Sequence, residues 1–162
     1  MPIINPVPAD PTDFPLDLLP LARDLRRRIP QDGGDELWCL VRRRWVVTQP
    51  EELVRQAAIS HLTTLGYPTA LMQLERSVKG TRNRLDLLVH DRSGAPYLLL
   101  EAKRPEVSHL RGVLQLADYS RGVGAPYAVA TNGSRAIGVY FDEASRMLRY
   151  LDALPAYPSD AT

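Results

Sequence analysis

Two stretches of the sequence decide the fold, RLDLLVH at residues 84–90 and PYLLLEAK at residues 96–103. Both are short and strongly apolar, which is typical of buried β-strands. The residues between them, Asp91-Arg92-Ser93-Gly94, have the composition of a turn. We therefore expect an antiparallel hairpin, and a further strand predicted at residues 71–78 extends it to a three-stranded meander.

Helical patterns lie on both sides of this meander. Residues 50–65 carry apolar side chains at helical spacing, with acidic residues in the first turn and Gly66 directly behind the last one. A second helix is predicted at residues 108–121, and further strands at 127–131, 136–141 and 147–151. This order predicts an α/β fold in which helices pack on a mixed sheet.

The N-terminal part differs in composition. Seven prolines within the first 35 residues argue against regular structure for most of that stretch, although Pro20 and the apolar residues around it predict one short helix that docks on the body. Residues 36–48 predict a hairpin with Arg42 to Arg44 at its tip. We expect a Pro-rich arm over residues 1–35, a domain over 36–157 and a tail over 158–162.

The overall composition describes an ordinary globular protein. The chain has 162 residues, 44% of them hydrophobic, and a net charge of +1, so any nucleic-acid site must be a local basic patch. Cys39 is the single cysteine and lies in an apolar string, where a buried thiol is expected. No apolar run approaches the ~20 residues of a membrane span, and the N-terminus does not resemble a signal peptide. These features predict a cytoplasmic protein that does not contact a membrane.

The two central strands carry charge where core strands normally carry none. Asp86 interrupts one aliphatic run, and Glu101 and Lys103 end the other. Glu101 and Lys103 share a face because side chains on a strand repeat every two residues. Pairing around the turn brings Asp86 and Glu101 close to being cross-strand neighbours.

Two carboxylates in such positions repel each other unless a cation lies between them. Mg²⁺, or Mn²⁺ in its place, takes oxygen ligands and usually needs only one or two carboxylates. Asp86 and Glu101 are the expected ligands, and the backbone carbonyl of Ala102 is the expected third. Lys103 beside the metal suits the orientation or deprotonation of an attacking water. The set predicts a phosphodiester hydrolase site.

A simpler interpretation stays open. The two strands could form a surface hairpin in which Lys103 only pairs with Asp86 or Glu101, a kind of ion pair that is common and contributes little to stability.

Several motifs carry a resemblance to a known family. Asp86, Glu101-Ala102-Lys103 and Gln115 with Tyr119 resemble the PD-(D/E)xK nuclease superfamily, in its branch with a Q-x-x-x-Y motif. Residues 43–47, 50–56, 65–68, 100–103 and 130–133 are similar to the N-terminal domain of type I restriction enzyme R subunits, in a short free-standing form. The resemblance covers about residues 38–157. It implies a restriction-endonuclease-like α-β-β-β-α-β core and Mg²⁺-dependent DNA cleavage by Asp86, Glu101 and Lys103, alone or within a larger defence or repair assembly.

The resemblance and the sequence around the site together suggest further site residues. Many members use an acid from the first helix, for which Glu51 and Glu52 both qualify, and Glu75 is a further candidate metal ligand. Gln115 and Tyr119, four residues apart on one helix, are expected to contact DNA. Basic residues near the site could neutralise phosphates; they are Lys79, Arg82, Arg84, Arg104 and Arg111.

One departure from the family limits the expected activity. The R subunits continue into an ATP-driven motor, whereas this sequence contains no G-x-x-x-x-G-K-S/T phosphate loop. We therefore expect no DNA translocation by this chain. The alternative to a nuclease is a catalytically silent module that uses the same fold to bind nucleic acid or a partner protein.

Overall fold

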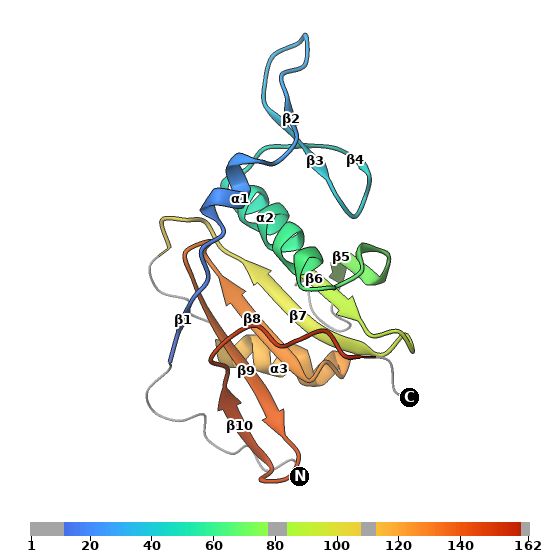
Figure 1. Ribbon diagram of the computed structural model, residues 1–162, viewed down its shortest axis with the longest axis vertical. Helices are drawn as coiled ribbons and strands as arrows, with labels where there is room; N and C mark the ends of the chain where they lie inside the picture. Colours follow the sequence, from blue (N-terminus) through green and yellow to red (C-terminus); the bar gives the residue numbers. More distant parts are fainter. Residues whose placement is uncertain (1–11, 78–83, 108–112, 160–162) are drawn as a thin grey trace.

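A computed structural model describes residues 12–77, 84–107 and 113–159 (Figure 1). It contains a seven-stranded sheet, a separate three-stranded sheet and two long helices. The elements are β1 (Phe14–Pro15), α1 (Leu19–Arg23), β2 (Arg27–Arg28), β3 (Glu36–Cys39), β4 (Arg44–Val47), α2 (Pro50–Thr64), a 3₁₀ turn (Thr69–Leu71), β5 (Met72–Ser77), β6 (Arg84–His90), β7 (Pro96–Ala102), α3 (Val113–Val123), β8 (Tyr127–Thr131), β9 (Arg135–Asp142) and β10 (Met147–Tyr150).

The large sheet has the mixed topology that the sequence predicts. Strands β5, β6 and β7 form the expected antiparallel meander, and β8 then pairs parallel to β7 after the crossover through α3. Strands β8, β9 and β10 are again antiparallel neighbours. The strand order is β1-β9-β8-β7-β6-β5, with β10 on β9. The fold is thus an α/β fold with a mixed central sheet, consistent with the predicted core.

The two long helices cover opposite faces of this sheet (Figure 1). Alternating residues of β6 and β7 face the two layers, because side chains on a strand point to opposite sides in turn. Leu87 and Leu100 pack with Ile59 and Leu62 of α2. Their neighbours on the other face pack with Ala117 of α3; they are Leu88, Leu99 and Ala128. Both strands are therefore buried on both sides, which explains their continuous apolar runs.

The described part of the predicted arm is more regular than its prolines suggest. Strand β1 pairs with β9, and Phe14, Leu16 and Leu18 are buried in the core on the α2 side. Pro15 is tolerated because β1 is a two-residue edge strand, where a missing N–H costs little. Helix α1 carries a proline in its first turn, as predicted. This segment is packed into the body of the molecule.

The three-stranded sheet contains the predicted hairpin. Strands β3 and β4 pair around a turn that holds Arg42 and Arg43, and β2 adds to the other side of β3. Leu37 and Cys39 are fully buried, which confirms the expected buried thiol. The small sheet stands at one end of the molecule, beyond α2 (Figure 1). In the ranges that the structure describes, no helix has both the length and the apolar character to cross a membrane.

Candidate functional site

The main chains of β6 and β7 part at Asp86. Their pairing ends at Leu87 and Leu100. Beyond this point β6 remains paired with β5, whereas β7 remains paired with β8. The backbone N–H of Ala102 donates a hydrogen bond of 2.9 Å to Oδ2 of Asp86. The carboxylate thus accepts from a main-chain donor of the neighbouring strand at the place where the two strands separate.

Glu101 and Lys103 lie on the other side of this opening. The Nζ atom of Lys103 is 3.0 Å from Oε1 of Glu101, and about a third of each side chain is exposed (34% and 35%). The register places Glu101 one residue beyond the last pair, next to Asp86. The structure therefore brings together the three residues that the sequence singles out. A salt-bridged hairpin would show the same Lys103–Glu101 contact, so the contact alone does not separate the two interpretations.

Burial is the main influence on Asp86. It raises the pKa of this carboxyl group because the charged form loses solvation. The N–H of Ala102 and the charges of Arg55 and Lys103 act in the opposite direction, while the charge of Glu101 raises the pKa further. Without an additional cation the ionised form of Asp86 is thus disfavoured, and a cation beside it would favour that form.

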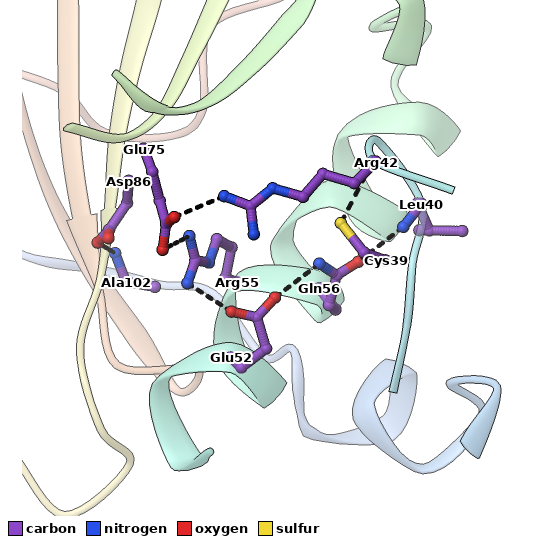
Figure 2. Close-up of polar contacts among 9 residues, drawn as sticks. All are labelled: Cys39, Leu40, Arg42, Glu52, Arg55, Gln56, Glu75, Asp86 and Ala102. Carbon is purple, nitrogen blue, oxygen red and sulfur yellow. Dashed lines mark hydrogen bonds and ion pairs between the residues drawn. The ribbon is translucent and has the colours of Figure 1, made fainter. Parts of the chain in front are cut away.

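Arg55 of α2 links the acidic residues around Asp86. Its guanidinium pairs with Glu52, and its Nη1 atom is 3.6 Å from Oε1 of Glu75 (Figure 2). Only 8% of Arg55 is exposed, and its Nε and Nη1 atoms have no hydrogen-bond partner within the described residues. A buried guanidinium needs anionic neighbours. Arg55 is therefore a cation shared by Glu52 and Glu75, and its charge also acts on Asp86.

The structure distinguishes between the two acids at the start of α2. Glu51 is exposed, whereas Glu52 is buried and faces Arg55. Gln56 donates to Oε1 of Glu52 at 2.9 Å, and its own Oε1 accepts the N–H of Leu40 at 3.1 Å. Of the two, Glu52 is the one placed toward the site, and through Gln56 it is joined to the hairpin of the small sheet.

Glu75 adopts an unusual backbone conformation. Its φ of 52° lies in the left-handed region, where a residue with a Cβ is strained by roughly 1–2 kcal/mol. Leu74 packs on the α2 side of the sheet, so regular alternation would point Glu75 to the other side. The left-handed turn instead directs Glu75 to Arg55 and to Arg42, whose Nη2 donates to it at 2.6 Å. This contact with Arg42 is the main cause that lowers the pKa of Glu75.

The predicted DNA-contacting residues are only partly described. Arg104 follows Lys103 and is exposed, with Nε 3.7 Å from Glu106. The main chains of Arg84, Gln115 and Tyr119 lie on β6 and α3, but their side chains lie outside the described part. Three further predicted residues lie wholly outside the described ranges; they are Lys79, Arg82 and Arg111.

The donor set suits a hard cation with few protein ligands. In residues 12–77, 84–107 and 113–159 no group of three or more His, Cys, Asp or Glu side chains is arranged to hold a metal. Asp86 and Glu101, with the carbonyl of Ala102, supply only oxygen atoms, which fits Mg²⁺ or Mn²⁺ with water in the remaining positions. Glu52 and Glu75 are paired with arginines and are less available as ligands.

Sequence reasoning missed Arg55 and Gln56. Both are buried within α2, between Val54 and Ala57, where a charged and an amide side chain interrupt an apolar series. The available signal was the three-residue spacing from Glu52 to Arg55, which allows an ion pair on a helix. That spacing is too common to identify a site by itself.

The arrangement and the comparisons with known proteins define the class. The protein is an α/β domain with a mixed sheet between two helices and with acidic residues where two central strands part. The chain belongs to the family described as type I restriction enzyme R protein N terminus, whose sequence model matches residues 50–155.

A solved structure is also similar, a fragment of a putative HsdR subunit of a type I restriction enzyme from Vibrio vulnificus YJ016. It shares 21% sequence identity with a TM-score of 0.49, over 67% of this chain and 24% of that one. The chain thus spans about a quarter of the length of that structure. None of the curated proteins matches the chain.

Proposed function

We propose that this chain is a divalent-metal-dependent DNA endonuclease. The observation that supports the proposal is the meeting of Asp86, Glu101 and Lys103 where β6 and β7 part. The family of the chain agrees with a nuclease-type domain. A cytoplasmic location and work within a larger DNA-processing assembly belong to the same proposal.

Each residue of the site has a distinct proposed role. The carboxylates of Asp86 and Glu101 and the carbonyl of Ala102 would hold Mg²⁺ or Mn²⁺, which supplies a Lewis acid for the phosphate and lowers the pKa of water. Lys103, held beside Glu101, would orient the attacking water and stabilise negative charge that develops on the phosphate. Arg55 would hold the carboxylates of Glu52 and Glu75 close together without contacting the metal.

The DNA would be positioned by residues around this centre. Gln115 and Tyr119 on α3 are proposed to contact DNA without taking part in the chemistry. Basic residues would neutralise phosphates; they are Lys79, Arg82, Arg84 and Arg104.

The test is a cleavage assay on plasmid, linear duplex and single-stranded DNA, with Mg²⁺, Mn²⁺ or EDTA. We expect cleavage only with metal, and a loss of at least about a thousandfold in Asp86→Asn, Glu101→Gln and Lys103→Ala, since removal of one member of a catalytic unit costs orders of magnitude. Circular dichroism would show that the variants remain folded. Equal cleavage by the wild type and by Lys103→Ala would refute the assignment of Lys103.

The second candidate is a catalytically silent module that binds nucleic acid or a partner protein. It is favoured by the ion pairs that already occupy Glu101, Glu52 and Glu75 in this structure. This candidate predicts DNA or protein binding without cleavage under any metal condition. The same assay, with binding measured in parallel, separates the two functions.

A further inference from the structure

The outer face of the small sheet carries both tryptophans of the chain. Trp38 on β3 and Trp45 on β4 are direct cross-strand partners, with ring centroids 5.4 Å apart in an edge-to-face arrangement. Leu37 and Cys39 point to the opposite, fully buried side of β3. The two indole rings are half-buried, so part of each remains accessible on a sheet face that no other element of the described structure pairs with.

Two arginines lie over these rings. The guanidinium carbon of Arg26 is 4.8 Å from the ring centroid of Trp38 and 5.1 Å from that of Trp45, and that of Arg28 is 4.5 Å from Trp45. Such stacking holds a guanidinium in place and leaves the N–H groups at its edge pointing away from the ring, where they can bind an anion. Arg28 also donates to Glu36 at 2.9 Å. Arg26 is exposed and has no ion pair within the described residues.

This end of the molecule is locally basic. Residues 23–47 contain seven arginines and four acidic residues, a net charge of +3, whereas the whole chain carries +1. Arg27 pairs with Asp35, which directly precedes β3, and Arg28 pairs with Glu36 of β3. An open depression beside these pairs is lined by Arg27, Arg28, Ile29 and Asp35. Val47 on the same face is 65% exposed, and Ile29 at the rim 81%.

We propose that this Trp–Arg face, defined by Arg26, Arg28, Trp38, Trp45 and Val47, binds single-stranded nucleic acid. Stacked arginines and aromatic rings on one basic surface match the chemistry of a single strand, whose phosphates bind guanidinium groups and whose unpaired bases stack on aromatic rings. The positive charge favours this occupant over a protein partner of ordinary composition.

The face lies outside residues 50–155, the range that the family matches. None of its residues belongs to the acidic site, so the proposal does not depend on the proposed cleavage activity. The hairpin that carries it also contacts the candidate site, since Leu40 donates to Gln56 and Arg42 to Glu75. A strand bound on the Trp–Arg face would consequently lie on an element that is attached to the acidic site.

Intrinsic tryptophan fluorescence gives a direct test, because all the tryptophan emission comes from this face. The full chain is titrated in EDTA with oligo(dT), and with a duplex of the same length. We expect oligo(dT) to quench the emission and to bind more weakly as salt rises. The double variant Arg26→Ala, Arg28→Ala should bind at least tenfold more weakly and show a smaller salt dependence, by about one unit of slope per arginine.

Arg149→Ala is the matched control. Its side chain is 50% exposed and pairs with Asp142, just as Arg28 is 47% exposed and pairs with Glu36. We expect this control to bind like the wild type. Val47→Glu adds a negative charge to the face without removing an arginine, so it should also weaken binding. This variant replaces the double variant if a melting curve shows that the double variant is unfolded.

Unchanged emission with oligo(dT) would overturn the proposal. A face that binds only a protein would give this result. Equal affinity of the double variant, Val47→Glu and Arg149→Ala would overturn it as well. Loss of cleavage in Asp86→Asn with intact quenching would leave this proposal standing, so the two proposals fail separately.

Discussion

The two ends of the β6–β7 pair differ: one is apolar and regularly paired, and the other is polar and has no pairing between the two strands. At one end Leu88 and Leu99 face each other with no exposed surface, as do Val89 and Leu98. At the other end the main chains part, and Asp86 accepts a hydrogen bond from Ala102 in place of a strand partner. The apolar end is stabilised by regular strand pairing and by burial of its side chains. At the polar end, each charged side chain needs a partner of opposite charge or a hydrogen-bond donor. The same side chains can therefore also bind a metal ion or a substrate.

The largest effect is expected where charge is buried most deeply. Arg55→Met would leave Glu52 buried without its cation, so we expect a loss of about 3–5 kcal/mol in the free energy of unfolding. Arg121→Met is the control, because Arg121 and Asp118 form an exposed ion pair with the same three-residue spacing. That variant should change stability by less than about 0.5 kcal/mol. Urea unfolding of both variants measures the difference, and equal losses would refute the role given to Arg55.

Leu99 and Glu101 lie two residues apart on the same face of β7, one in its apolar part and the other at its polar end. Leu99→Ala should cost about 2–5 kcal/mol, since it removes a fully buried side chain and leaves a cavity. Glu101→Gln, two residues further along, should remain within about 0.5 kcal/mol of the wild type in stability. Denaturant melts of the metal-free proteins test this. A large destabilisation by Glu101→Gln would mean that Glu101 is a structural residue.

A smaller effect is expected on α3. If Gln115 and Tyr119 position DNA, Gln115→Ala and Tyr119→Phe should lower cleavage at least tenfold, about 1.4 kcal/mol on the transition state. The shift of the melting temperature by metal should stay intact in both variants. Full cleavage activity in both would return these residues to a packing role.

The smallest effect concerns Asp86 in the absence of metal. Burial raises its pKa in the folded state, so ionised Asp86 destabilises the fold. This cost is absent below the unfolded pKa, near 3.8, and grows as the pH rises through the raised folded pKa. Asp86→Asn should therefore increase stability by roughly 0.5 kcal/mol at pH 7 and by less at pH 4. Denaturant melts at the two pH values measure this gap, and a destabilised variant at pH 7 would contradict the expectation.

The regular elements were predictable because their apolar residues have clear periods. Residues 84–90 and 96–102 were predicted as strands, and β6 and β7 have these bounds. The helix at Pro50 was predicted from its acidic first turn and apolar series, and α2 begins there. Strands β1 and β2 were not predicted, since two residues carry no period and Pro15 argues against a strand. Their pairing depends on β9 and β3, which no local pattern reveals.

The centre of the site was visible in the sequence for a related reason. Asp86, Glu101 and Lys103 stand out because they interrupt aliphatic strands, whereas Arg55 lies on a helix where charged residues are ordinary. The reversed direction of Glu75 follows from a left-handed backbone and from Arg42, far away in the chain. The choice of Glu52 over Glu51 likewise required the packing of α2. Gln115 and Tyr119 rest on the family resemblance and stay predictions.

Thermal unfolding with and without Mn²⁺ tests most directly whether the polar end of β6 and β7 is a metal site. A site that gathers Asp86 and Glu101 only in the folded state should gain roughly 1–3 kcal/mol of stability when Mn²⁺ exceeds its dissociation constant ten- to a hundredfold. We therefore predict a rise in the melting temperature of the wild type and no rise in Asp86→Asn. No rise in the wild type at millimolar Mn²⁺, or an equal rise in Asp86→Asn, would contradict the metal site.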